Sequence, residues 1–174
     1  MKKAIIIFIL LIITFFAYTE EKTIYDRYPI AVGIYFHFVS WSPLLQYQQY
    51  ISDIGFQIGA IFFSSANTYD TYNYAAEITG SYRIFSIDWS NWFSSALYGL
   101  LDISNWGRYY YSYGENAYRF SSSLSGGIGM GVDIVFFEHF SLALELGYGI
   151  SSFSLMTGSL NIGLITGVGL RYRI

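Results

Sequence analysis

Few residues in this sequence could carry out catalysis or bind a metal. The chain contains two histidines, His37 and His139, and no cysteine, which excludes a disulfide scaffold and a cysteine-ligated metal site. Two histidines also argue against a metal site built from histidine alone. No G-x-S-x-G nucleophile motif accompanies them. We therefore expect no catalytic residue, no metal and no cofactor.

Three glycines with regular spacing, Gly127, Gly129 and Gly131, could suggest a phosphate-binding loop. Such loops follow a strand, open a helix and do not keep a spacing of two. The spacing instead predicts a strand, and the alternation of apolar and polar residues along the chain predicts that the strands form a narrow membrane barrel. Inside such a barrel, the glycines would leave room for Arg and Tyr side chains.

Charged side chains at alternating strand positions form the main candidate site. They could provide a polar pathway or ligand site, or an internal network in which opposite charges satisfy one another. We favour the network, because charges enclosed in a narrow barrel must pair or be hydrated. The set is Glu77, Arg83, Asp133, Glu145, Arg171 and Arg173.

A tyrosine-rich segment around a turn signal forms a second candidate site. The predicted strand from Tyr118 to Phe136 would be about 60 Å long and, when tilted, about 45 Å tall, whereas a membrane barrel has an apolar band of about 25 Å. We therefore predict a hairpin from Trp106 to Phe120 that protrudes and binds partners by strand addition at its edges. Its exposed residues are Tyr109, Tyr110, Tyr111, Tyr113 and Glu115.

The composition indicates one apolar domain. The 174 residues are 53% hydrophobic, 21% aromatic and 12% charged, which excludes a disordered chain. A formal net charge of -3 and a pI near 5.2 argue against a nucleic-acid partner.

The chain alternates between apolar and polar residues with a period of two, which predicts β-strands. Alternate residues of each predicted strand form two sets, or phases, which point to opposite faces. The strand charges all fall in the phase that also holds Gly and Ser, whereas the other phase is apolar. Lipid would cover such an apolar outer face, and a closed barrel satisfies the backbone there. The sequence predicts an all-β fold, a single antiparallel transmembrane up-and-down barrel. The alternative is a soluble periplasmic lipocalin-like binder with the apolar phase inside.

The N-terminus has the features of an export signal. Lys2 and Lys3 precede an apolar run from Ala4 to Ala17. Because charged residues begin at Glu20, the run is shorter than the roughly 20 apolar residues that a membrane-spanning helix needs. We expect a cleaved signal peptide at 1–19 and a barrel domain at 20–174.

The segments GGIGMGVDIVF, SLALELGYG and GVGLRYRI, between Tyr118 and Ile174, resemble the small outer-membrane β-barrel proteins of double-membraned bacteria, the group of OmpX, Ail and the OmpA barrel. The resemblance implies an outer-membrane location, contact with outer-membrane lipid and a monomer. It also implies that the barrel assembly machinery reads Leu170, Tyr172 and Ile174.

Seven strands are recognisable, and bacterial barrels have an even number. We expect an eighth strand within 20–28 or 41–50, with short periplasmic turns at 86–91 and 137–139. An odd-numbered loop at 137–139 would place Glu145 opposite Gly131 or Gly129.

These features predict a structural or adhesin-like protein whose exposed hairpin contacts a host or envelope surface partner. The alternative is a narrow solute passage or a small-ligand-binding barrel. Some related barrels modify lipid A with a His, a Ser and an acidic residue at the outer leaflet. Because His139 falls in a predicted periplasmic turn, we expect no enzyme.

Overall fold

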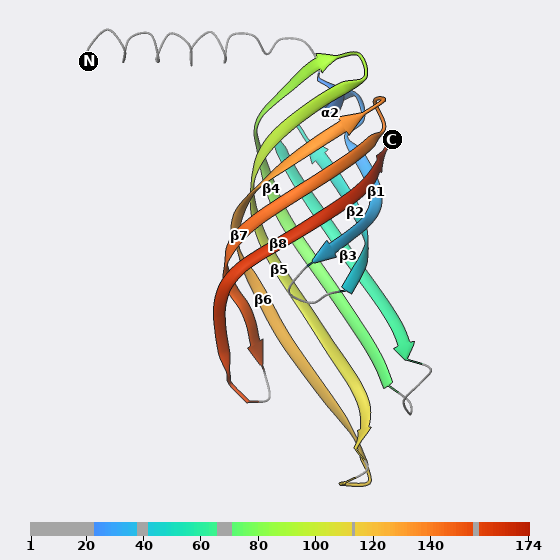
Figure 1. Cartoon of the computed structure of the whole chain (residues 1–174), viewed down its shortest axis with the longest axis vertical. Helices are drawn as coiled ribbons and strands as arrows, with labels where there is room; N and C mark the ends of the chain where they lie inside the picture. Colours follow the sequence, from blue (N-terminus) through green and yellow to red (C-terminus); the bar gives the residue numbers. More distant parts are fainter. Residues whose placement is uncertain (1–22, 38–41, 66–70, 113, 155–156) are drawn as a thin grey trace, which may run out of the picture.

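The computed structural model describes residues 23–37, 42–65, 71–112, 114–154 and 157–174, so the expected signal peptide at 1–19 lies outside the described residues. Each strand pairs antiparallel with its neighbours in sequence, and the last pairs with the first, which closes a barrel (Figure 1). The predicted eight-stranded up-and-down barrel is confirmed. The strands are β1 (Ile30–His37), β2 (Ser42–Ile51), β3 (Ile54–Ser65), β4 (Thr71–Ser90), β5 (Phe93–Ser112), β6 (Ala117–Phe136), β7 (Phe140–Ser154) and β8 (Leu160–Arg173).

The eighth strand that the sequence left unplaced is β2, in the second of the two expected segments. The first segment contains a short helix instead, α2 (Ile24–Arg27). The turn predicted at 86–91 is wrong in extent, because β4 continues to Ser90 and pairs it with Phe93. The three-residue turn at 137–139 is confirmed by the pairing of Phe136 with Phe140.

The two faces of the barrel have opposite chemistry. Outward side chains are apolar and exposed, for example Leu45 and Ile128 at 68% each, whereas Arg171 and Arg173 are buried inside. On the described strands, the charged side chains all stand in the inward phase. Among the described residues, no helix is long and apolar enough to cross a membrane.

The barrel wall is uneven in height. β4, β5 and β6 each have 20 residues, whereas β1 has 8 and β2 has 10. Figure 1 shows the hairpin of β5 and β6 extending well beyond β1 and β2, at the end opposite α2 and the C-terminal end of β8. Its strands stay paired up to Ser112 and Ala117, so the predicted protrusion is a β-ribbon.

The helix α2 closes the end of the barrel that carries the short turns (Figure 1). The backbone N–H and the hydroxyl of Thr23 donate to Asp26 Oδ2, at 3.1 and 2.9 Å, and fix the first turn. Ile24 and Tyr25 are each 1% exposed and pack against Ala96 and Val135. A four-residue helix is too short to be stable alone, so these contacts hold it.

We predict that Tyr25→Ala lowers the free energy of unfolding by about 3–5 kcal/mol, because it leaves a cavity at a buried aromatic site. It also removes the hydrogen bond that the Tyr25 hydroxyl donates to the Asp133 carbonyl, at 2.8 Å. Urea unfolding of the detergent-folded barrel measures the change. Phe137→Ala, at a side chain that is 67% exposed, serves as the control. Equal losses in the two variants would contradict the docking of α2.

Candidate functional site

The centre of the lumen is organised around Glu145 of β7. The Tyr98 hydroxyl donates to Glu145 Oε1 at 2.7 Å, and the Tyr35 hydroxyl donates to Oε2 at 2.6 Å. Gly131 and Gly167 lie opposite Glu145 on the neighbouring strands. A Cβ at Gly131 would lie 2.3 Å from Tyr98 Cζ, and one at Gly167 would lie 1.8 Å from the Tyr35 hydroxyl. These two glycines therefore make room for the tyrosines that hold the carboxylate.

Arg171 of β8 provides the charge that balances Glu145. Its Nη2 lies 3.4 Å from Glu145 Oε1 and donates to Gln57 Oε1 at 2.7 Å, while its Nε donates to Gln46 Oε1 at 2.7 Å. Gln48 Oε1 accepts a longer bond of 3.4 Å from Nη1. The guanidinium is thus surrounded by acceptors from β2, β3 and β7, as burial of a charge requires.

A second ion pair lies nearer the short-turn end. Arg173 of β8 donates to Asp133 of β6, and both side chains are almost completely buried. The guanidinium carbon of Arg173 lies 4.5 Å from the centre of the Tyr25 ring, so the helix covers this pair with a cation–π contact.

A third group lies on β1, β4 and β5. Thr79 Oγ1 is 3.2 Å from both Glu77 Oε1 and Asp102 Oδ1, and His37 Nε2 is 3.8 Å from Asp102 Oδ2. No set of three or more His, Cys, Asp or Glu side chains within the described part of the chain could hold a metal ion.

Arg83 lies apart from this network, at the mouth of the barrel. Its Nη2 donates to Asp26 Oδ1 of α2 at 2.6 Å and to Asp53 Oδ1 of the β2–β3 turn at 3.0 Å. Arg27, the next residue of the helix, lies 3.4 Å from Asp88 and 3.9 Å from Glu138. Ion pairs therefore connect the helix, directly or through Arg83, to the β2–β3 turn, to the end of β4 and to the β6–β7 turn.

Burial raises the pKa of Asp26, but the hydrogen bonds and charge of Arg83, together with the bonds from Thr23, outweigh it and leave the pKa below its ordinary value.

The six sequence-predicted lumen residues thus separate into different groups. Arg171 meets Glu145, Arg173 meets Asp133, Glu77 stands with Thr79 and Asp102, and Arg83 binds the helix. Sequence reasoning missed the uncharged members of the network. The alternation could have identified these residues, because each occupies an inward position of its strand. They are Tyr35, Gln46, Gln48, Gln57 and Tyr98.

The predicted hairpin residues divide between the two faces of the ribbon. Tyr109 and Tyr111 share the outward face, Tyr110 stands on the other face, and Glu115 pairs with Arg119 beside the turn. Tyr113 lies outside the described residues. The three residues of the predicted assembly signal point outward, with exposures of 58% for Leu170, 44% for Tyr172 and 61% for Ile174.

His139 has a structural environment in the turn between β6 and β7. Its ring stacks on Tyr172 at 5.2 Å, and its Nδ1 lies 2.9 Å from the Arg173 carbonyl oxygen. It therefore links the turn to the last strand, and no Ser or carboxylate is hydrogen-bonded to it among the bonds of the described residues.

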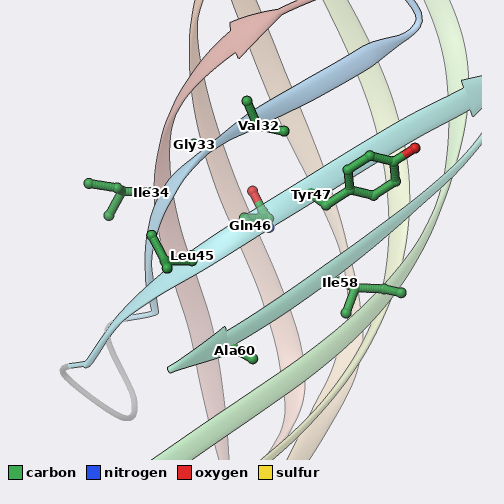
Figure 2. A pocket seen from close by; sticks show the side chains of 8 residues that line it. All are labelled: Val32, Gly33, Ile34, Leu45, Gln46, Tyr47, Ile58 and Ala60. Carbon is green, nitrogen blue, oxygen red and sulfur yellow. The ribbon is translucent and has the colours of Figure 1, made fainter. Parts of the chain in front are cut away.

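A shallow apolar groove crosses the outer surface of β1, β2 and β3 (Figure 2). Two rows of cross-strand neighbours form it, because Val32 pairs with Tyr47 and Tyr47 with Ile58, and the next row ends in the small side chain of Ala60. The groove faces away from the lumen and has no charged side chain in its lining. Its lining is Val32, Gly33, Ile34, Leu45, Gln46, Tyr47, Ile58 and Ala60.

We predict that Glu145→Ala lowers the free energy of unfolding by about 3–5 kcal/mol, because Arg171 remains buried without its carboxylate. Glu145→Gln retains an acceptor and is expected to cost less. Urea unfolding in detergent measures both. Glu115→Ala removes an exposed pair with Arg119 and should change stability little. A loss as large as that of Glu145→Ala would contradict the conclusion that the buried pair of Glu145 and Arg171 contributes more to stability than an exposed pair does.

Asp26 also gives the barrel a dependence on pH. A carboxyl whose folded pKa is lowered stabilises the fold above its unfolded pKa, near 3.8, and loses that contribution as the pH falls through the folded value. We expect Asp26→Asn to destabilise the protein at neutral pH and to converge with the wild type as the pH falls from the unfolded pKa through the lower folded pKa of Asp26. Melting temperatures of both proteins across this range test the expectation, and a constant difference would refute it.

Comparison with known proteins found similarity in structure alone. No family model matches the chain, and no curated protein sequence matches it. The N-terminal β-barrel domain of Pseudomonas aeruginosa OprF is similar at a TM-score of 0.51 and 11% identity, over 83% of this chain and 95% of that one.

Two further solved structures are more distant. The attachment invasion locus protein Ail of Yersinia pestis has a TM-score of 0.42 at 18% identity, over 83% of this chain and 96% of that one. Neisserial surface protein A has a TM-score of 0.37 at 15% identity, over 83% and 91%. The similarity to the OprF domain, together with the closed eight-stranded barrel, confirms at the level of fold the expected resemblance to small outer-membrane β-barrels.

Proposed function

We propose that this protein is an integral outer-membrane β-barrel with a non-enzymatic, structural and surface-interaction role. The observation that carries the proposal is the inverted sheet, with exposed apolar side chains outside and ion pairs inside. Such an outer surface is costly in water, whereas lipid covers it and the closed barrel satisfies its backbone groups.

Two features of the sequence support delivery to that membrane. The apolar segment with a basic start at 1–19 supports export, and the outward, alternating Leu170, Tyr172 and Ile174 support recognition by the barrel assembly machinery. The outward apolar surface needs no second copy of the chain once lipid surrounds it, which supports a monomer.

The filled lumen argues against a role in solute passage. Each of the eight strands contributes a buried inward side chain, and α2 covers the short-turn mouth. A barrel of this size is only just wide enough for side chains. The surface therefore offers more room for interaction than the interior does.

The β5–β6 ribbon supplies the interaction surface in this proposal. Along β6, backbone pairing with β5 continues to Ala117, opposite Ser112, whereas the described pairing with β7 begins at Ser123, opposite Ser154. By contrast, β4 is covered by β3 as far as Thr71. An open strand edge can pair with an extended segment of another chain, here a host or envelope surface protein.

Shortening the ribbon tests this role. Removing 109–120 and joining the paired residues Arg108 and Ser121 through Asn-Gly keeps a two-residue hairpin and deletes most of the open edge. We expect cells that display this variant to adhere to immobilised extracellular-matrix proteins no better than cells lacking the protein.

Two controls separate folding from binding. Closed barrels often resist detergent until heated, so the shortened variant should still shift on gels between unboiled and boiled samples. The full-length variant Glu115→Ala with Arg119→Ala retains the ribbon backbone and should retain adhesion. Normal adhesion by a folded, shortened variant would refute the interaction role, whereas recovery of the wild type from the soluble periplasm would refute the membrane location.

A further inference from the structure

The outward face of the β4–β6 ribbon carries a continuous series of aromatic rings. Tyr72 lies opposite Tyr109 and Tyr109 opposite Phe120, while Tyr111 lies opposite Tyr118. Directly paired residues share a face of the sheet. Ile78 and Ile103 also pair with each other, an even number of residues from Tyr72 and Tyr109, so the two pairs share one face of the sheet. Because Ile78 and Ile103 are exposed at 64% and 60%, this is the apolar face that points away from the lumen.

These rings stand above the apolar band. Phe120 lies 16 positions along β6 from Phe136, at the short-turn end. At about 3.3 Å per residue and a tilt of about 40°, Phe120 stands about 40 Å above Phe136, about 15 Å beyond an apolar band of about 25 Å. The polar headgroup layer of a bilayer is only about 5–8 Å thick on each side. The upper rings therefore stand beyond the headgroup layer of an ordinary bilayer, at the height of the sugars in a larger glycolipid headgroup.

The rings are fixed by one another and by a glycine. Tyr109 and Tyr118 stack in parallel at 5.0 Å, and both are exposed, at 41% and 47%. The ring of Tyr74 crosses Gly107 to stack on Phe120 at 6.1 Å, and a Cβ at Gly107 would lie 2.4 Å from Tyr74 Cε1. The Tyr74 hydroxyl donates to Asn105 Oδ1 at 2.7 Å. The face is thus largely ordered before any partner binds.

No charge lies among the described residues of this face. Arg108 pairs across the strands with Asn73 and Ser121, in the opposite phase, and Arg119 pairs with Tyr110 on that same side. A phosphate or carboxylate would find no cation here. The exposed groups are aromatic rings and phenol hydroxyls, which combine an apolar surface with polar tips.

We propose that this tyrosine face, Tyr72, Tyr109, Tyr111, Tyr118 and Phe120, binds neutral sugar rings of glycolipid headgroups in the outer leaflet. The inference rests on the proposed outer-membrane location. Sugar rings present apolar C–H surfaces that pack on aromatic rings and hydroxyls that pair with phenols. Because the face continues the lipid-facing wall and points sideways, its neighbours are the surrounding lipids, whereas the open edge of β6 can serve a protein partner.

Glycolipid retention by the detergent-folded, full-length barrel tests the proposal. The probes are lipopolysaccharide with core sugars and lipid A, which has the phosphates and acyl chains without the core. After affinity capture of the barrel from a mixed micelle, we expect the wild type to retain at least about five-fold more of the sugar-bearing lipid, equivalent to about 1 kcal/mol. The ratio should not change with salt, because no ion pair is involved.

Variants on the two faces of one strand provide the matched control. Tyr109→Ser with Tyr118→Ser should bring the ratio close to one, whereas Tyr110→Ser, on the opposite face, should leave it unchanged. If the double variant fails to show the heat-dependent gel shift, Tyr109→Leu with Tyr118→Leu replaces it. Equal retention of both lipids by the wild type, an unchanged ratio in the folded double variant, or a ratio that collapses in high salt would overturn the proposal.

The outcomes also separate this inference from the proposed function. A folded barrel in the outer membrane that shows no preference for sugars refutes the tyrosine face alone. A protein that shows no heat-dependent shift and is recovered as a soluble protein refutes the membrane location, on which the inference depends.

Discussion

The interior of an eight-stranded barrel is so narrow that each large inward side chain needs a small neighbour. Glu145 can accept bonds from Tyr35 and Tyr98 because Gly131 and Gly167 lie beside it. Once a carboxylate is enclosed there, burial demands a cation, and Arg171 of the last strand supplies it. Space and charge together therefore join strands that are far apart in sequence, and they leave the outward face of the described strands without a charged side chain.

Alternation made the barrel predictable from sequence, because burial in lipid acts on every second residue of each strand. The odd-numbered turn predicted that Glu145 lies opposite Gly131 or Gly129, and the observed register pairs it with Gly131. β2 was harder to place, since Gln48 points inward while the adjacent Gln49 points outward and blurs the pattern. The helix α2 left no periodic signal, because four residues hold barely one turn.

The pairing inside the lumen could not be read from the sequence. A shared phase indicated which charges face inward, but which Arg meets which carboxylate depends on the stagger of strands around the closed barrel. Arg83 has the same phase as Arg173, yet one binds the β2–β3 turn and the helix while the other binds Asp133. The outward tyrosines likewise became one surface only when the register of β4, β5 and β6 was known.

The docking of α2 carries a consequence for the order of assembly. The helix comes first among the described elements, but its partners include Asp133 on β6 and Arg173, the residue before the C-terminal Ile174. Those partners come together only when β6, β7 and β8 have paired. The helix can therefore reach its buried position only after β8 has formed, so its burial marks a late step in the assembly of the barrel rather than its beginning.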